Sequence, residues 1–197
     1  LHLPEEMPDL PRARLNGRLA RVPDFTIDVE ANRAKVRQQK LKLREQPLVI
    51  INTLHMKSIP SRAESGGLEK LAGIPLPTDI PILLHMGGVG KEKPLERVID
   101  AVAHCKKPLF FLAFCNAPQS KLDELQEYTG KNLNKGAYKL LGPQRREDLL
   151  ASAWEADLGV VDYSTSIENT SNQRYCAPTK LYEFMALGLA VVGSNNL

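Results

Sequence analysis

The sequence predicts an α/β fold built on a doubly wound parallel sheet. From Pro81 onward, short apolar runs alternate with amphipathic stretches, which is typical of repeated strand–helix units around a parallel sheet. The apolar runs are rich in Leu, Ile and Val without polar alternation, so we expect strands that are buried on both faces. A glycine-rich turn, 87–90, separates the first of these runs from the helix predicted after it.

The elements of the C-terminal part follow from apolar periodicity and from turn residues. Pro94 suits the first position of a helix, and Gly188 suits the position just after a helix ends. Strands are expected at residues 82–86, 109–114, 138–141, 158–161 and 190–192. Helices are expected at residues 94–104, 120–128, 146–154 and 179–187.

The front part repeats this pattern on a smaller scale, with a strand at 25–29, a helix at 31–43 and a strand at 48–51. Between the two parts, residues 57–80 are rich in Ser, Gly and Pro and leave room only for a short helix at 68–71. We therefore expect three regions: a smaller strand–helix–strand part at 1–56, a linker at 57–80, and the main domain at 81–197.

Composition narrows the class of protein. An apolar content of 43% is sufficient for a buried core. No apolar run approaches the roughly 20 residues that a membrane span needs. Three cysteines without a C-x-x-C pair argue against a disulfide framework, which favours a cytoplasmic location. The chain opens with Leu1 and no leader, so we expect a fragment of a longer protein.

The predicted helix at 31–44 carries six basic residues and no acid. We favour a solvated helix face, and we keep open peripheral association with an anionic membrane surface or a phosphorylated acceptor. Nucleic acid is not expected as a partner, because no aromatic stacking pattern accompanies the charges.

The glycine turn is the first candidate for chemistry. It runs Gly87-Gly88-Val89-Gly90-Lys91-Glu92-Lys93-Pro94, between a predicted strand and a predicted helix. Exposed backbone N–H groups, a helix N-terminus and the charge of Lys93 would together stabilise a diphosphate. Glu92 stands where a Walker loop needs Ser or Thr, and the dinucleotide fingerprint also fails. An ordinary strand-to-helix turn is the alternative.

The second candidate is the helix that starts at Pro178 and Thr179. Lys180 and Glu183 share one of its faces at i, i+3 spacing. They could form a solvent-exposed ion pair of little energetic weight. Alternatively, Glu183 accepts hydrogen bonds from ribose hydroxyls while Lys180 and the helix start meet phosphate.

The stretch P-x-K-L-x-E-x-M-A-x-G-x-x-V-V, residues 178–192, resembles the donor-site signature of retaining GT-B glycosyltransferases of the sucrose-synthase and polysaccharide-biosynthesis kind. Three other segments, 84–93, 140–149 and 156–161, resemble the same family in order and at compatible spacing. The resemblance implies a GT-B fold whose nucleotide-sugar-binding domain spans 81–197 and is truncated at its C-terminus, with 1–56 as a remnant of the acceptor-side domain.

The resemblance also implies roles for single residues. It assigns Lys93 to the donor diphosphate and Glu183 to the ribose, and both are our catalytic candidates. The remaining donor-binding candidates are Gly87, Gly88, Gly142, Pro143, Thr179 and Lys180, with Gly142 and Pro143 beside the base.

Two positions depart from the family pattern. Gly88 stands where the family commonly has an arginine, and Tyr175 stands where the first carboxylate of an E-x7-E pair belongs. Glu168, in the polar loop that precedes the donor helix, could supply a replacement contact to the sugar, and the hydroxyl of Tyr175 could do the same.

No D-x-D sequence occurs, so we expect neither a metal nor another cofactor. The four histidines are scattered without ligand spacing, and we interpret His85 as a core or edge residue of its strand.

The implied activity is transfer of a hexosyl unit from a nucleoside diphosphate sugar to a glycan, polysaccharide or lipid-linked acceptor, with retention of configuration. We expect this chain alone to bind nucleotide weakly and not to turn over. The alternatives are a non-catalytic nucleotide-binding or regulatory module and a GT-B-like sugar-nucleotide epimerase.

Overall fold

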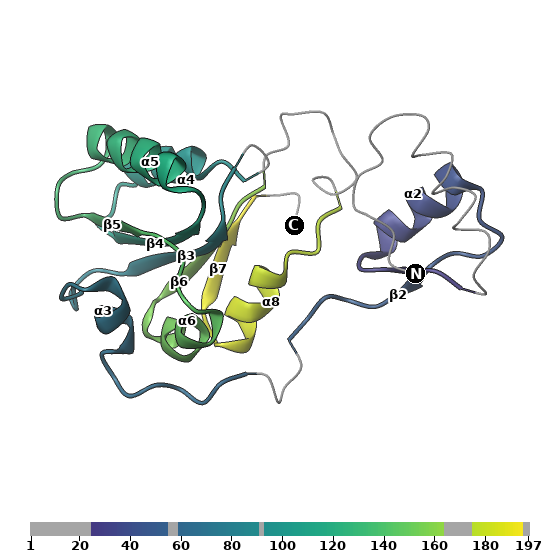
Figure 1. Ribbon diagram of the computed structural model, residues 1–197, viewed down its shortest axis with the longest axis horizontal. Coiled ribbons are helices and arrows are strands. Elements are labelled where there is room, and N and C mark those ends of the chain that lie inside the picture. Colours follow the sequence, from purple (N-terminus) through teal and green to yellow (C-terminus); the bar gives the residue numbers. More distant parts are fainter. Residues whose placement is uncertain (1–24, 55–58, 91–92, 164–174, 195–197) are drawn as a thin grey trace. The chain divides into compact units, whose positions relative to one another are not determined.

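A computed structural model of the chain describes residues 25–54, 59–90, 93–163 and 175–194 (Figure 1). The chain divides into two compact units. The larger unit comprises 53–164 and 179–194, and the smaller unit comprises 1–52, 165–178 and 195–197. Each unit is described by itself.

The larger unit contains a five-stranded parallel sheet in the order β5-β4-β3-β6-β7. Its strands are β3 (Ile82–Gly88), β4 (Phe110–Asn116), β5 (Tyr138–Leu141), β6 (Leu158–Val161) and β7 (Ala190–Gly193). Six successive residues of β4 are buried, as expected for a strand covered on both faces. The α/β, doubly wound class predicted from the sequence is confirmed.

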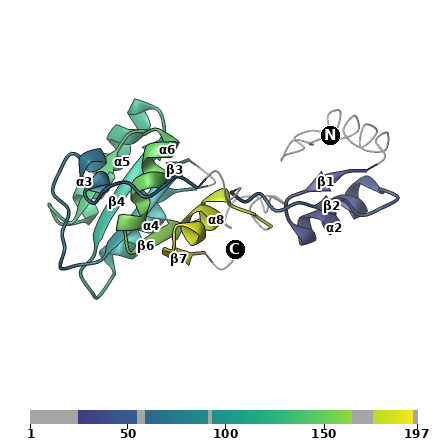
Figure 2. The same cartoon turned by 90° about the horizontal axis from the view of Figure 1, so that it is seen from below.

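Helices cover both faces of this sheet. They are α3 (Gly67–Ala72), α4 (Leu95–Ala103), α5 (Gln119–Asn132), α6 (Arg146–Ser152) with the short 3-10 helix η2 (Ala153–Glu155), and α8 (Thr179–Ala186). Figures 1 and 2 show α4 and α5 on one face, and α3, α6 and α8 on the other. Helix α5 extends past the predicted end at residue 128, because Thr129 lies buried with its hydroxyl donating to the Leu125 carbonyl.

A hydrophobic core lies between the sheet and the pair α4 and α5. Residues of alternate positions on β3 and β4, such as Leu83, Phe111 and Ala113, pack there against Leu95 and Ile99 of α4. Because strand side chains alternate between faces, His85 and Gly87 share this face with Leu83. The start of α4 is therefore held above the end of β3.

The segment 57–80 is predicted as a linker, but its described residues pack on the larger unit. Leu68 of α3 is completely buried, and the guanidinium of Arg62 lies 5.0 Å from the centroid of the Trp154 ring. Glu155 caps α3 by accepting from the backbone N–H groups of Gly67 and Leu68 at 3.0 and 3.2 Å. Only two apolar residues of this short helix, Leu68 and Ala72, are buried. A pattern of two residues between segments rich in Gly and Pro is too short to predict packing from the sequence.

The smaller unit contains the parallel unit β1 (Ile27–Asp28), α2 (Ala31–Leu41) and β2 (Leu48–Val49). Helix α2 ends two residues before its predicted end because Lys42 adopts the left-handed conformation, with φ of 51°. The strand–helix–strand order predicted for this part is confirmed, and its assignment as a remnant of a second Rossmann-like domain stays a prediction.

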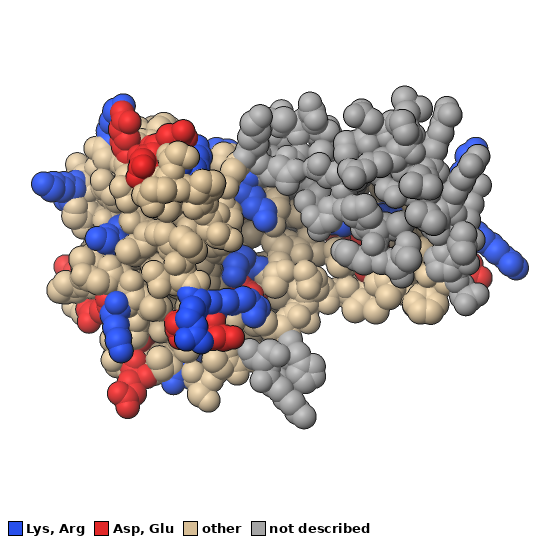
Figure 3. All heavy atoms as spheres, viewed as in Figure 1, with Lys and Arg blue, Asp and Glu red and all other residues tan. Residues whose placement is uncertain are grey.

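The basic helix is less basic on its surface than its sequence indicates. Arg33 and Arg37 point their Nε atoms at the carboxylate of the buried Asp28, at 3.1 and 3.2 Å. Exposed basic side chains remain at Lys35, Lys40, Lys42 and Arg44. Where the chain is described, no helix is long and apolar enough to cross a bilayer. On the larger unit, Figure 3 shows Lys and Arg interspersed with Asp and Glu.

Candidate functional site

Strands β3 and β6 of the larger unit separate near their carboxyl ends. Strand β3 pairs with β4 along its whole length, up to Gly88 opposite Asn116. It pairs with β6 only at two positions, the last of which joins Leu84 and Gly159. In open α/β sheets, ligands bind in the crevice at the carboxyl ends of the strands where the strand order reverses. The sheet order places that reversal between β3 and β6.

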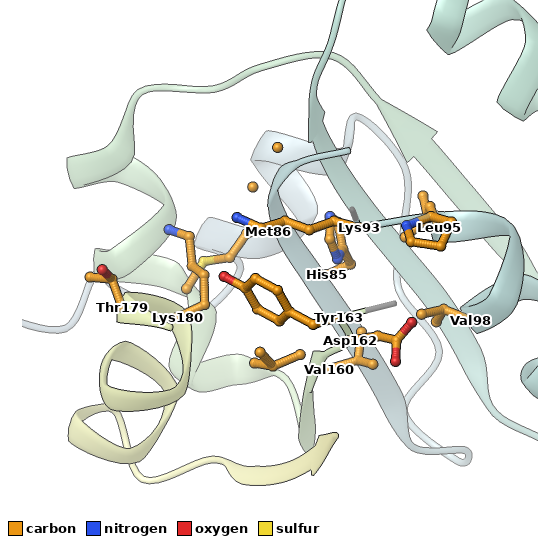
Figure 4. Close-up of a pocket in the computed structure, with 14 residues that line it drawn as sticks. His85, Met86, Lys93, Leu95, Val98, Val160, Asp162, Tyr163, Thr179 and Lys180 are labelled. Carbon is orange, nitrogen blue, oxygen red and sulfur yellow. The ribbon is translucent and has the colours of Figure 1, made fainter. Parts of the chain in front are cut away.

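A pocket of about 240 Å³ occupies this crevice (Figure 4). Four segments line it: the end of β3 from His85 to Gly88, the start of α4 with Lys93 and Pro94, the end of β6 through Tyr163, and the first turn of α8 with Thr179 and Lys180. Five of the predicted donor-binding residues therefore lie around one pocket: Gly87, Gly88, Lys93, Thr179 and Lys180.

Two lysines approach this pocket from different elements. The Lys93 ammonium lies 4.8 Å from the centroid of the Tyr163 ring, a cation–π contact. Lys180 enters from α8, and Figure 4 shows the Tyr163 ring between the two lysines. The N-termini of α4 and α8 border the same pocket and carry partial positive charge. The pocket therefore concentrates positive potential, which suits an anionic ligand.

Gly87 allows Lys180 to lie over the end of β3. Its φ of 144° is a conformation that side chains rarely adopt, and a Cβ there would lie 3.4 Å from Cε of Lys180. Gly88 is different, because a Cβ at this position would meet nothing closer than the Asn116 carbonyl oxygen at 4.0 Å. The space around Gly88 would therefore accept a side chain, and packing does not explain why glycine stands where the resemblance leads us to expect an arginine.

Glu183 does not line the pocket. It does pair with Lys180, but its carboxylate is buried, so the alternative of a solvent-exposed pair does not apply. Its side chain is buried on α8. Oε1 accepts from Nε and Nη2 of Arg146 at 3.0 and 2.5 Å, and Oε2 accepts from Nζ of Lys180 at 2.5 Å. Two cations thus compensate the buried carboxylate, as its burial requires. Glu183 therefore fixes the position of Lys180 at the pocket edge.

Arg146 was not identified from the sequence. It opens α6, and its partner Glu183 is 37 residues away. One signal was present, because a cation in the first turn of a helix opposes the helix dipole and needs another reason to be there. Its guanidinium links α6 to α8.

Asp162 and Tyr163 of the pocket wall were also missed. Asp162 lies at the end of β6, where its Oδ2 is 3.5 Å from Nε of Arg97 on α4. No local pattern marks these two residues, since they stand out only when β6 is placed beside α4.

His85 was interpreted as a core or edge residue of its strand. It lies on the central strand with a buried Nε2, and it also lines the pocket. Burial lowers the pKa of His85 to about 4. A backbone hydrogen bond at Gly87 acts in the opposite direction, and the charges of Lys180 and Lys93 lower the pKa further. The imidazole is therefore neutral at pH 7.

The other predicted contacts are not brought to this pocket. Gly142 and Pro143 follow β5 at the far edge of the sheet and do not line it. Glu168 lies outside the described residues, and Tyr175 belongs to the smaller unit. In the described part of the chain, no cluster of three or more His, Cys, Asp or Glu side chains could hold a metal ion.

Neither a protein-family model nor a curated protein matches the chain. Solved structures do match its fold. HepE of Anabaena in complex with UDP-glucose superposes with a TM-score of 0.69 at 17% identity, over 94% of this chain and 49% of that one. A glycosyltransferase from Rickettsia africae gives 0.66 at 17% identity, over 91% and 47%.

Sucrose-phosphate synthase from Thermosynechococcus elongatus is a third match, with a TM-score of 0.61 at 19% identity, over 95% of this chain and 44% of that one. The chain thus spans about half the length of these structures or somewhat less. At this level of identity the likeness concerns the fold, and it is the GT-B type with a Rossmann-like domain that the sequence resemblance predicts.

Proposed function

We propose that this chain, which has a GT-B fold, carries the donor-binding domain of a glycosyltransferase that uses a nucleoside diphosphate sugar. The observation that carries the proposal is the pocket between β3 and β6, where the glycine turn, Lys93 and the start of α8 meet. Structures of the same fold that hold UDP-glucose or UDP support the choice of donor class.

The proposed chemistry depends on electrostatic stabilisation of the leaving diphosphate. As the bond between the anomeric carbon and the diphosphate oxygen breaks, negative charge develops on the departing oxygens. Lys93, Lys180 and two helix N-termini already border the pocket before this charge develops. Such preorganised positive groups lower the activation barrier, because they need not rearrange during the reaction. With this positive charge in place and no D-x-D sequence, we expect no metal requirement.

We further propose transfer of a hexosyl unit with retention of configuration to a glycan, polysaccharide or lipid-linked acceptor, in the cytoplasm or at its membrane surface. The sequence resemblance supports retention and the acceptor class. The residues that would meet an anionic surface are the exposed Lys35 and Lys40 of α2, with Lys42 and Arg44 just after it.

Glu183 is proposed to contact the ribose in the bound state. A carboxylate offers about four acceptor positions, and Arg146 and Lys180 already donate to it. Because the side chain is completely buried, a ribose hydroxyl reaches it only after Lys180 or Arg146 moves.

The proposal is tested by calorimetric titration of UDP, GDP, ADP and UDP-glucose into the wild type, Lys93→Ala and Glu183→Gln. We expect Lys93→Ala to weaken binding of the preferred nucleotide by roughly 10- to 150-fold, since a charged hydrogen bond contributes about 1.5–3 kcal/mol. Lys106→Ala removes the same charge at an exposed position and serves as the control. Equal affinity in the wild type and Lys93→Ala would remove the donor-site assignment.

A second candidate is a non-catalytic nucleotide-binding module, favoured by Gly88 and Tyr175 at positions where the family has charged contacts. NMR analysis of the products formed from a bound donor and glycan acceptors separates the candidates. Transfer with an unchanged anomeric configuration supports a retaining transferase, an altered nucleotide sugar supports an epimerase, and binding without product supports the module.

A further inference from the structure

His85 occupies the point at which β3 and β6 part. The last paired residues of these strands are Leu84 and Gly159, so among the described residues His85 is the first of β3 without a strand neighbour on that side. On the other side it lies opposite Ala113 of β4. Its side chain lines the pocket beneath the start of α4, next to Lys93 in Figure 4.

One ring nitrogen of His85 has no protein partner. Nε2 is buried, and among the described residues nothing forms a hydrogen bond with it. A buried polar atom without a partner costs free energy, and most such atoms in native proteins are satisfied by protein, water or ligand. Because His85 lines the pocket, a molecule bound there could provide the missing partner.

The charged groups around this ring come from three elements. Lys93 lies just before α4, Lys180 lies on α8, and Asp162 and Tyr163 directly follow β6. Asp162 is partly neutralised by Arg97, so the lysines dominate.

The fourth neighbour is β4, whose titratable residue on this face is Cys115. Burial raises the pKa of its thiol to about 12, so the thiol is neutral. The empty pocket therefore surrounds a neutral imidazole with net positive charge, and this charge opposes protonation.

A diphosphate in the pocket reverses that balance. Its negative charges would meet Lys93 and Lys180 and lie within the same cavity as the ring. An imidazolium is then favoured, because its N–H donates to a phosphate oxygen in a charge-assisted hydrogen bond. The proton comes from solvent and forms an N–H bond on the ring, and no bond of the ligand breaks.

We infer that His85 is a further donor-binding residue, which takes up one proton when the diphosphate group of a nucleotide sugar enters the pocket. The inference rests on the proposed donor function. Binding and protonation are reciprocal, so donor affinity must rise as the pH falls. One coupled proton gives at most a tenfold rise per pH unit.

The test is calorimetric titration of UDP-glucose between about pH 5 and pH 8, in buffers of different ionisation enthalpy. UDP-glucose is chosen because its diphosphate stays ionised throughout this range. The wild type is compared with His85→Gln, which keeps a polar group near Nε2 but cannot titrate. His104→Gln is the control, because His104 is exposed and follows the last residue of α4.

We expect proton uptake and a pH-dependent affinity in the wild type and in His104→Gln, and neither in His85→Gln. The same proton uptake in His85→Gln as in the wild type overturns the inference, and so does its absence from the wild type. If UDP-glucose binds to no variant at any pH, the proposed donor function fails and the inference fails with it.

A second measurement applies if His85→Gln does not fold. The ring proton signals of the wild type are titrated by NMR with and without UDP-glucose. A rise in the pKa of a buried histidine on addition of UDP-glucose supports the inference, and an unchanged pKa in the presence of bound ligand overturns it.

Discussion

Replacing Gly159 by alanine is expected to destabilise the larger unit and disturb the pocket together. Gly159 lies in the middle of β6, where it pairs with Leu84 on one side and Val191 on the other. The ring of Phe184 on α8 packs directly on it. A Cβ at position 159 would lie 2.5 Å from Cδ2 and 2.7 Å from Cδ1 of that ring.

The size of the effect follows from these distances. Carbon atoms in contact normally lie about 3.5–4.0 Å apart, so the ring must retreat by roughly 1 Å. Phe184 is completely buried and β6 is held by strands on both sides, so α8 has to move instead. Overpacking of this kind costs about 1–3 kcal/mol. Because α8 carries Lys180 and Glu183, the nucleotide affinity should fall as well.

Urea unfolding followed by circular dichroism measures the free energy of unfolding of the wild type, Gly159→Ala, Phe184→Leu and the double variant. The smaller Leu side chain leaves room for the new methyl group, so the double variant should be more stable than the sum of the single effects predicts. Gly142→Ala is the control, because its Cβ would meet Leu122 at an ordinary 3.5 Å. A Gly159→Ala effect below about 0.5 kcal/mol, or strict additivity, would refute this packing argument.

Three further predictions concern the remaining contacts of the larger unit. Glu155→Ala should cost about 1–2 kcal/mol of unfolding free energy in urea, since it removes the cap of α3. Glu127→Ala, which breaks only an exposed pair with Lys131, should cost under about 0.5 kcal/mol, and equal losses would contradict the capping role. Arg146→Met should cost about 1–3 kcal/mol by leaving Glu183 short of a partner. The double variant with Glu183→Leu should recover much of this loss, and no recovery would show that the pair is not the cause. Finally, as the pH falls, His85 is protonated in the unfolded state before it is protonated in the folded state, because burial lowers its folded-state pKa to about 4. Stability without ligand should therefore fall by about 2 kcal/mol between about pH 7 and pH 5, and His85→Gln should lack this part of the slope in urea titrations at the two pH values.

The order of strands and helices could be predicted because each element carries its own local pattern. Uninterrupted apolar runs marked the buried strands, and Pro94 and Gly188 marked helix ends. The glycine turn and the start of α8 were each predicted to meet phosphate, and both line the pocket. These features depend on residues within one or two turns of each other.

The features that could not be predicted depend on residues far apart in the chain. Glu183 was assigned to the ribose, but its burial became evident only with Arg146, which comes from another helix. The positive charge of α2 was overestimated, because Asp28 precedes the helix and lies buried against Arg33 and Arg37. The pocket beside His85 was not predicted, because the divergence of β3 from β6 leaves no mark in the sequence.

The divergence of β3 from β6 also means that backbone amides of β3 can report whether a ligand is bound in the pocket. Beyond Leu84 and Gly159, the peptide groups on one side of β3 have no partner strand, whereas those on the other side stay paired with β4 up to Asn116. Amide hydrogens on the open side should exchange with deuterium readily in the empty protein, and those on the paired side should exchange slowly. A molecule seated in the pocket would slow only the first set. Mass-spectrometric exchange over the peptide that contains 82–88 could therefore reveal an occupant before its chemical identity is known.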